Sequence, residues 1–597
     1  MPESIIHEKE SKLVQGNIVT ERDVMIPMRD GVRLATDIYR PDDDREHPVM
    51  VISAPYDKND FPRAHLLMFS PFVGALRDYV VLSQDARGRY NSEGTWQPFG
   101  DEAEDAYDTV EWAAKQPWSN GNVGLYGSCS LAYHALQGAV EQPPHLKAVF
   151  AYATAADFYE GWTYSGGAFE LGFQMAYAAV VSPDTLSRQE LTAEESEEFT
   201  KSIGEISQMF GIDPKKMHEH LPNHLPVIDY PGLRLLPYWK QWLSHPSYDE
   251  FWQRANMVER ANRINVPVLH ASSWQDMCLR SHTALNTALL TSSDPSVRDK
   301  HRFIIGPWDH SAYYNHREAY AGEREYDTET GSGFLSPLLL NWFDHWLKGG
   351  PEKVMPGENG VRFYQTGENA WKEDVSWPPA HTVTKYFLHS DGRANSRFGN
   401  GSLSLASPEV EPVDSYVYDP LDPVLSVGGQ SMGIPIGVYD QAEIEERDDI
   451  LVFTTPRLAE AVEIAGPVSV TLLASSSAED TDFTVKLVDV EPNGYCANIT
   501  EGIVRARYRN DTRHAEFLVP DETTEFEIAM IDTAHTFREG HAIRVEISSS
   551  NFPRFDRNLN ARITPALGSE ADARKAVQRI FHDSARPSAL NLPVVAS

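Results

Sequence analysis

The pattern of hydrophobic and polar positions divides the chain into three regions. In the first region, short apolar runs alternate with polar turns and with one stretch that has helical spacing. The runs are Val24–Pro27, Val32–Ile38, Val49–Ala54 and Tyr79–Gln84, and the helical stretch is Asp101–Gln116. Strands that alternate with helices are typical of an α/β domain built on a mostly parallel sheet. We therefore predict such a domain over residues 1–155.

The pattern becomes aromatic and helical after about Ala155, with few strand-like alternations. This change predicts a helical cap inserted over residues 156–262. Strand-like runs return at Val266–Ser272 and Arg302–Gly306, and each ends in a polar loop. The α/β domain is therefore expected to be discontinuous and to continue over residues 263–350.

A third region follows a Gly- and Pro-containing segment that begins at Gly349. Strand-like runs then succeed one another with few helical stretches, as at Thr382–Leu388, Val468–Leu473, Phe483–Val490 and Ile543–Ile547. This succession predicts an all-β sandwich over residues 355–597. With 597 residues the chain also exceeds the roughly 250 to 300 that one hydrophobic core supports.

Net charge narrows the range of partners. The chain carries 87 acidic and 52 basic residues, a formal net charge of −35, which repels nucleic acids and anionic lipid surfaces. The first 25 residues have mixed charge, and no apolar run approaches the roughly 18 residues of a membrane span. We expect a small-molecule substrate and no nucleic-acid or membrane partner. A neutral or cationic substrate is compatible with this charge, although an acidic surface more often serves only solubility.

The cysteines and histidines show no pattern of a cross-linked or metal-bound protein. Cys129, Cys278 and Cys496 are too scattered for a disulfide framework, which suits a reducing cytoplasm. Neither they nor the histidines show the spacing of a metal site. Phosphate-binding GxxxxGK loops and dinucleotide fingerprints do not occur. We expect no metal and no cofactor.

The segment from Gly124 to Ala132 has the features of a nucleophile elbow. It reads Gly-Leu-Tyr-Gly-Ser-Cys-Ser-Leu-Ala, follows a short apolar stretch and opens into a run suited to a helix. In such elbows the nucleophile lies two residues after the glycine that opens the turn. Here that glycine is Gly127, so the nucleophile position is Cys129. A thiol at a helix N-terminus gains thiolate character, and the Ser130 backbone N–H can face an oxyanion. The alternative is a small buried residue.

Two later segments supply an acid and a base in the order that such enzymes use. The strand-like run from Pro267 ends in a loop at Asp276, and the run from Phe303 ends in a loop at His310. Asp309, beside His310, is a second candidate for the acid, but Asp276 has the better position at the end of a strand-like run. The sequence alone thus predicts a Cys129, His310 and Asp276 triad.

Several further segments make a family resemblance specific. Together with the elbow, these motifs resemble the cocaine-esterase family of α/β hydrolases, which is related to X-prolyl dipeptidyl peptidases and α-amino-acid ester hydrolases. The matching segments are Arg29–Leu34, Pro55–Lys58, Asp85–Arg89, Gly121–Gly124, Gly306–Trp308, Thr481–Thr484 and Ser548–Pro553. The likeness covers nearly the whole chain.

The resemblance implies both an architecture and roles. It implies an α/β-hydrolase domain with an inserted helical cap and a C-terminal jelly-roll domain, and it makes a homodimer plausible. Asp276 would orient the imidazole of His310, the general base. Tyr56 would donate its O–H to the oxyanion beside the Ser130 amide.

The chain departs from the family at the nucleophile. The family carries serine where this chain has Cys129, and usually glycine where it has Ala132. Ser128 and Ser130 flank the position, each one residue out of register, and remain alternative nucleophiles. A Cys–His pair can form a thioester from an ester, amide or thioester, so hydrolysis and transfer to an amine or alcohol are both open.

The sequence is also compatible with functions other than acyl transfer. The same pocket could serve a non-covalent cyclase, lyase or isomerase with Tyr56 and His310 as acid and base, and a degenerate triad could leave a binding protein. Trp162 and Phe169 are candidates for an aromatic substrate pocket, with cap core as the alternative. Cys278 borders the predicted site, either as a pocket residue, as a redox partner of Cys129 or as an inert buried thiol.

Overall fold

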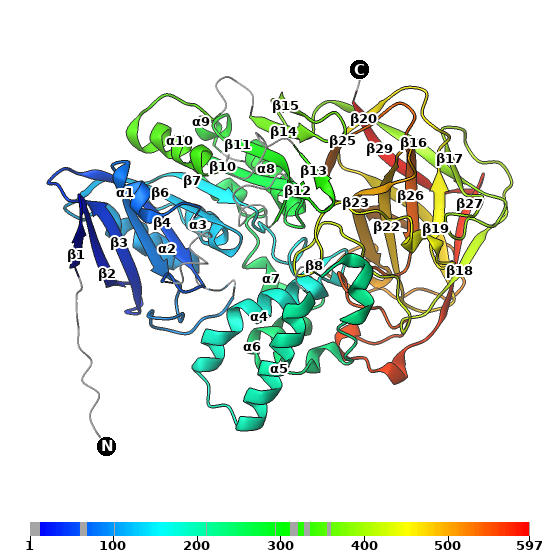
Figure 1. The fold of residues 1–597 in the computed structure, drawn as a ribbon, viewed down its shortest axis with the longest axis horizontal. Coiled ribbons are helices and arrows are strands. Elements are labelled where there is room, and N and C mark those ends of the chain that lie inside the picture. Colours follow the sequence, from blue (N-terminus) through cyan, green and yellow to red (C-terminus); the bar gives the residue numbers. More distant parts are fainter. Residues whose placement is uncertain are drawn as a thin grey trace.

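The computed structural model describes residues 12–59, 68–98, 100, 102–209, 212–292, 294–310, 320–326, 335–354 and 360–595. Its three parts are an α/β domain, a helical cap below it and a β-sandwich beside both (Figure 1). The predicted fold class is confirmed. Among the described residues no helix is both long and apolar enough to cross a bilayer.

An eleven-stranded sheet forms the α/β domain. In spatial order its strands are β1 (Lys12–Gln15), β2 (Ile18–Pro27), β3 (Arg33–Pro41), β5 (Val80–Asp85), β4 (His47–Ala54), β6 (Ser119–Ser128), β7 (Leu146–Tyr152), β10 (Val268–Gln275), β11 (Arg302–Asp309), β14 (Val361–Gln365) and β15 (Ala370–Asp374). The run from β5 to β14 is parallel, and the strands outside it pair antiparallel. Parallel strands place their carboxyl ends on one edge, where sites of α/β proteins form.

Helices cover both faces of this sheet. They are α1 (Pro71–Leu76), α2 (Glu102–Ala114), α3 (Ser130–Val140), α8 (Leu279–Ser292), α9 (Pro295–Arg298) and α10 (Leu335–Lys348). Alternation along β6 shows how two of them are placed. A Cβ on Gly124 would strike Phe343 of α10, whereas the next residue, Leu125, contacts Gly138 of α3. Since neighbouring strand residues point to opposite faces, α3 and α10 lie on opposite sides of β6.

The first sheet extends further along the chain than the sequence indicated. β14 and β15 fall within residues 355–597, which we assigned to the sandwich, yet β14 pairs parallel with β11. Short strands near a sheet edge have no sequence feature that tells one sheet from the other. The eleven-stranded sheet therefore continues to Asp374.

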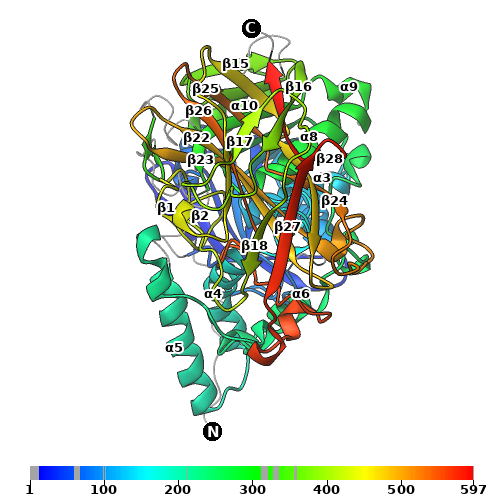
Figure 2. The same ribbon diagram turned by 90° about the vertical axis from the view of Figure 1, so that its right-hand side faces the viewer.

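The described part of the cap contains four α-helices, several short 3-10 helices and a small hairpin. The α-helices are α4 (Leu171–Ser187), α5 (Ala193–Met209), α6 (Pro237–Ser244) and α7 (Glu250–Gln253), preceded by β8 (Tyr164–Ser165) and β9 (Ala168–Phe169). Figure 2 shows α5 extending away from both sheets. The hairpin rests on the sandwich, where the Arg505 N–H donates to the Gly166 carbonyl at 2.8 Å.

The C-terminal region is all-β, as predicted. Its main strands are β16 (His381–His389), β17 (Ser402–Ser404), β18 (Asp414–Tyr418), β19 (Leu451–Thr454), β20 (Val462–Gly466), β21 (Ser469–Ser476), β22 (Asp482–Val490), β23 (Cys496–Arg505), β24 (Thr524–Ala529), β25 (Thr533–Phe537), β26 (Ala542–Ser548), β27 (Ala576–Asp583), β28 (Arg586–Pro587) and β29 (Ala589–Val595). Two-residue strands β12 (Tyr320–Ala321) and β13 (Arg324–Glu325) pair with each other between the two large sheets.

The sandwich also supports the strand that leads to Asp276. The Gln430 side-chain amide donates to the Trp274 carbonyl at 2.7 Å, and the Trp274 indole N–H donates to the Tyr364 carbonyl at 2.6 Å. Trp274 is fully buried. The C-terminal region thus helps to fix the end of β10, beside the predicted site.

Candidate active site

Cys129 lies at a strained turn between a strand and a helix. β6 ends at Ser128, α3 begins at Ser130, and Cys129 between them has φ 53° and ψ −132°. This conformation is rare for a residue with a side chain and occurs where surrounding structure imposes it. The Cys129 N–H donates to the Tyr152 carbonyl of the neighbouring β7 at 2.9 Å, which holds the turn in place.

Gly127 makes the tight turn sterically feasible. A Cβ on Gly127 would lie 2.4 Å from the Leu131 carbonyl carbon and 2.5 Å from the Ala132 nitrogen, closer than atoms can approach. The glycine therefore lets the first turn of α3 pack directly on the end of β6. Ala132, the second departure from the family pattern, is fully buried in this contact.

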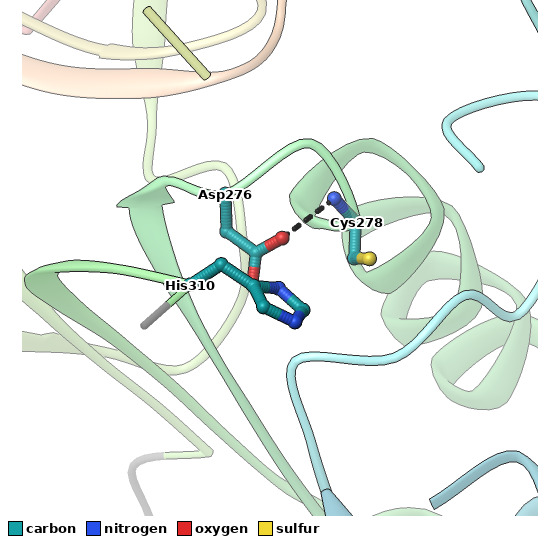
Figure 3. Close-up of side chains that lie close together, drawn as sticks. All are labelled: Asp276, Cys278 and His310. Carbon is teal, nitrogen blue, oxygen red and sulfur yellow. Dashed lines mark hydrogen bonds and ion pairs between the residues drawn. The ribbon is translucent and has the colours of Figure 1, made fainter. Parts of the chain in front are cut away.

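Asp276 and His310 meet at the carboxyl ends of two adjacent parallel strands. β10 and β11 pair in a register that sets Gln275 opposite Asp309, so the residues that follow leave the sheet side by side. His310 Nδ1 lies 3.1 Å from Asp276 Oδ2. Asp276 is fully buried and His310 is 2% exposed. Figure 3 shows the carboxylate and the imidazole facing each other.

The electrostatics of the three residues favour a charged imidazole. Burial alone would lower the pKa of His310, but the charges of Asp276 and Cys129, and side-chain hydrogen bonds with both, raise it well above its usual value. Burial likewise opposes ionisation of Asp276, yet His310 lowers its pKa. Imidazolium between a carboxylate and a thiol is the arrangement that favours a reactive thiolate.

The predicted oxyanion donors lie next to each other and beside Cys129. Tyr56 follows β4, and the Ser130 hydroxyl donates to the Tyr56 oxygen at 2.9 Å. That bond uses the phenol as acceptor and not its proton. The Ser130 N–H belongs to the first turn of α3, where amides have no partner within the helix. The hydroxyl contact therefore brings the Tyr56 phenol next to the first residue of α3.

Cys278 lies against the same acid and base. Its N–H donates to Asp276 Oδ1 at 2.8 Å, and its thiol is fully buried. Burial, followed by the charge of Asp276, raises the pKa of Cys278 well above its usual value. The Cys278 thiol therefore resists ionisation near neutral pH.

Both predicted aromatic pocket residues are buried in the cap. Trp162 packs edge-on against Phe173 and Tyr177, with ring centroids 4.8 and 5.5 Å apart. Phe169 packs edge-on against Trp239 at 5.7 Å. Their contacts are those of cap core, and their role in binding substrate stays a prediction.

Tyr177 and Tyr152 are neighbours of the site that the sequence analysis did not single out. Burial, then the charges of Tyr56 and Cys129, raise the pKa of Tyr177 well above its usual value, so Tyr177 lies within electrostatic range of Cys129. The Tyr152 carbonyl accepts the Cys129 N–H, and burial, followed by the charge of Asp276, raises the pKa of the Tyr152 phenol. Its position at the end of β7 was the only signal for Tyr152, and Tyr177 lies on a cap helix whose docking no local pattern reveals.

Comparisons with known proteins give matches over nearly the whole chain. The family model of the X-Pro dipeptidyl-peptidase (S15 family) matches residues 30–312, and that of the X-Pro dipeptidyl-peptidase C-terminal non-catalytic domain matches residues 354–591. Cocaine esterase from Rhodococcus sp. (strain MB1 Bresler) is 34% identical over 597 residues, covering 98% of this chain and 100% of that protein.

Solved structures resemble the chain over its whole length. An aminopeptidase from a marine sediment archaeon, Thaumarchaeota archaeon, superposes with a TM-score of 0.81 at 28% identity, covering 100% of this chain and 99% of that one. An α-amino acid ester hydrolase superposes with a TM-score of 0.79 at 25% identity, covering 100% of both chains. The arrangement of α/β domain, cap and sandwich is therefore shared with proteins that are named as an aminopeptidase and an ester hydrolase.

Proposed function

Because the chain belongs to the X-Pro dipeptidyl-peptidase (S15) and cocaine-esterase family, we propose that it is an acyl-transfer enzyme whose intermediate is a thioester on Cys129. Membership makes it an enzyme of the esterase and peptidase class of hydrolases. The nucleophile, the triad roles and the acyl acceptor are the proposal.

One observation carries the proposal: the strained backbone of Cys129, with φ 53°, at the end of β6. Strained residues cluster at active sites, and a side-chain hydrogen bond between Cys129 and His310 supports such a role here. Ser128 lies within β6 and Ser130 within α3, so neither occupies the strained position. This favours Cys129 over both serines as nucleophile.

The first half-reaction forms the thioester. The Cys129 thiolate attacks the carbonyl carbon of an ester, amide or thioester, and the carbonyl electrons move onto oxygen. The Tyr56 O–H and the Ser130 N–H stabilise that oxyanion by hydrogen bonds. When the oxyanion collapses, His310 donates a proton to the departing alcohol, amine or thiol. Asp276 keeps the imidazole oriented throughout.

The second half-reaction discharges the acyl group. An acceptor attacks the thioester while His310 accepts its proton, and Cys129 leaves as thiolate, so charge and protons return to the starting state. Water as acceptor gives hydrolysis; an amine or alcohol gives transfer. A thioester remains a good acyl donor to amines, which supports including acyltransferase activity in the proposal.

Substrate class follows from charge and surroundings. A net charge of −35 disfavours an anionic acyl donor, so a neutral or cationic small molecule is proposed. Tyr177, within electrostatic range of Cys129, supports an acyl group with apolar or aromatic character. Three cysteines without disulfides support a cytoplasmic location, and a homodimer is compatible with the family.

Intact-protein mass spectrometry tests the proposal. Wild type and Cys129→Ala are exposed briefly to activated esters and acyl thioesters, with and without an added amine. We expect one acyl adduct in wild type, none in Cys129→Ala, and faster discharge when the amine is present. A Cys129→Ala enzyme that turns substrate over at the wild-type rate would overturn the covalent mechanism and favour non-covalent chemistry by Tyr56 and His310.

A further inference from the structure

A second thiol completes a group of three metal-binding side chains at the triad. Asp276, Cys278 and His310 each offer a ligand atom, and these atoms all lie within 4.8 Å of one another. All three residues are buried, with exposed fractions of 0%, 0% and 2%. They converge in Figure 3. Within the described part of the chain, no other His, Cys, Asp or Glu residues form such a group.

The fold holds these three side chains in fixed relation. Asp276 and Cys278 occupy the short turn between β10 and α8, where the Cys278 N–H donates to Asp276 Oδ1 at 2.8 Å. His310 arrives from the end of β11 and places Nδ1 3.1 Å from Asp276 Oδ2. The segments that directly follow two paired strands therefore supply all three ligands, and support from regular elements is how precise sites are built.

We propose that Asp276, Cys278 and His310 bind a zinc ion that reversibly inhibits the enzyme. Thiolate, imidazole and carboxylate are the ligands that zinc takes from proteins. With bonds of about 2.0–2.1 Å, nitrogen and oxygen ligands of a tetrahedral zinc lie roughly 3.3 Å apart, close to the 3.1 Å between His310 Nδ1 and Asp276 Oδ2. Zinc sites with three protein ligands commonly keep a fourth position for water.

The buried charge does not change when zinc binds in this way. Zn²⁺ replaces the proton on His310 Nδ1 and the proton on the Cys278 thiol, and both protons leave to solvent. Two positive charges enter and two leave, so the net charge of the buried group stays constant. Burial, which strongly opposes adding an uncompensated charge, therefore opposes this exchange little.

Inhibition follows from which nitrogen the metal takes. An imidazole bound to zinc through Nδ1 keeps its remaining proton on Nε2, the nitrogen on the side away from Asp276. His310 then cannot accept a proton from a nucleophile or an acyl acceptor. The sequence predicted no metal because these ligands come from two distant segments without zinc-site spacing.

Cobalt spectroscopy on full-length protein tests the site without relying on turnover. Co²⁺ bound by a thiolate gives a near-ultraviolet charge-transfer band. We expect this band, at one Co²⁺ per chain and under a non-thiol reductant, in wild type, in Cys129→Ala and in the matched control Cys496→Ala. We expect none in Cys278→Ala. Because Cys129→Ala lacks the proposed nucleophile, a cobalt band in this variant would support the metal site even if the thioester mechanism were wrong.

Zinc affinity gives the quantitative outcome. In competition with a chromophoric chelator, Cys278→Ala should bind Zn²⁺ at least about tenfold more weakly than wild type, since even outer-shell changes cost that much. His310→Gln, with Cys278 intact, should weaken binding similarly, which guards against misfolding of one variant. Equal affinity in wild type and Cys278→Ala, or a cobalt band that disappears in Cys129→Ala, would overturn the proposal.

Discussion

His310 Nδ1 lies 3.1 Å from Asp276 Oδ2, although the two residues are 34 positions apart in the chain. The parallel pairing of β10 and β11 brings them together, because each residue directly follows the carboxyl end of its strand. Both are buried, so bulk salt screens their interaction little. The pair fixes the orientation of the imidazole, which we propose acts on Cys129.

Asp276→Asn should slow the enzyme and shift its pH profile. Loss of the carboxylate removes the charge that raises the pKa of His310, so that pKa falls. The alkaline limb of kcat/KM should therefore move to lower pH by about one unit or more, as expected for a removed ion partner. kcat should fall by roughly 10³–10⁴-fold, as in other triads. An unshifted alkaline limb would mean that Asp276 does not act on the imidazole.

Tyr56→Phe should impair the chemical step more than substrate binding. It removes one donor to the oxyanion and should lower kcat by about 10²–10³-fold with little change in KM. Ser130→Ala is the matched control, because it removes only the hydroxyl that donates to Tyr56 and keeps the backbone N–H. Its kcat should stay within about tenfold of wild type. A loss in Ser130→Ala as large as in Cys129→Ala would point to Ser130 as nucleophile.

Cys129 should be the most reactive thiol. Burial and Asp276 raise the pKa of Cys278 well above its usual value, and burial raises the pKa of Cys496 to about 12. At about pH 7.5, iodoacetamide should therefore label Cys129 first. Peptide mapping would identify the labelled residue. All three thiols should react at similar rates in denaturant. Faster labelling of Cys278 in the folded protein would contradict the assigned reactivity.

Gly127→Ala should destabilise the elbow. Its Cβ would lie 2.4 Å from backbone atoms of Leu131, so the strand and helix must separate. We expect the free energy of unfolding to fall by about 3 kcal/mol, measured by denaturant titration. Gly204→Ala is the control, because Gly204 lies in α5 with nothing within 4 Å of the new Cβ. That variant should gain about 0.5–1 kcal/mol. Equal changes in the free energy of unfolding for the two variants would show that the close contact at Gly127 does not determine the stability of the elbow.

Local pattern was sufficient for much of the fold. The runs Val49–Ala54 and Phe483–Val490 are buried strands, and Asp101–Gln116 encloses α2, because apolar periodicity follows directly from which side of an element faces the core. The assignment of β14 to the first sheet could not be made this way. Its partner, β11, is set by tertiary pairing and not by its own five residues.

In the candidate site, too, some residues could be predicted from local sequence pattern and others could not. Cys129, Asp276 and His310 could be found because each follows a strand-like run in the expected order. Tyr177 could not, since its approach to Cys129 depends on how α4 docks onto the α/β domain. The clustering of Cys278 with His310 depends on strand pairing across distant segments.

The central claim is that Cys129 carries the acyl group during turnover. Rapid-quench mass spectrometry of a single turnover measures it directly, with peptide mapping to locate the adduct and comparison of its rates with kcat. We predict an adduct on Cys129 that forms and decays at least as fast as kcat. An adduct on Ser128 or Ser130, or one on Cys129 that decays more slowly than turnover, would contradict the account.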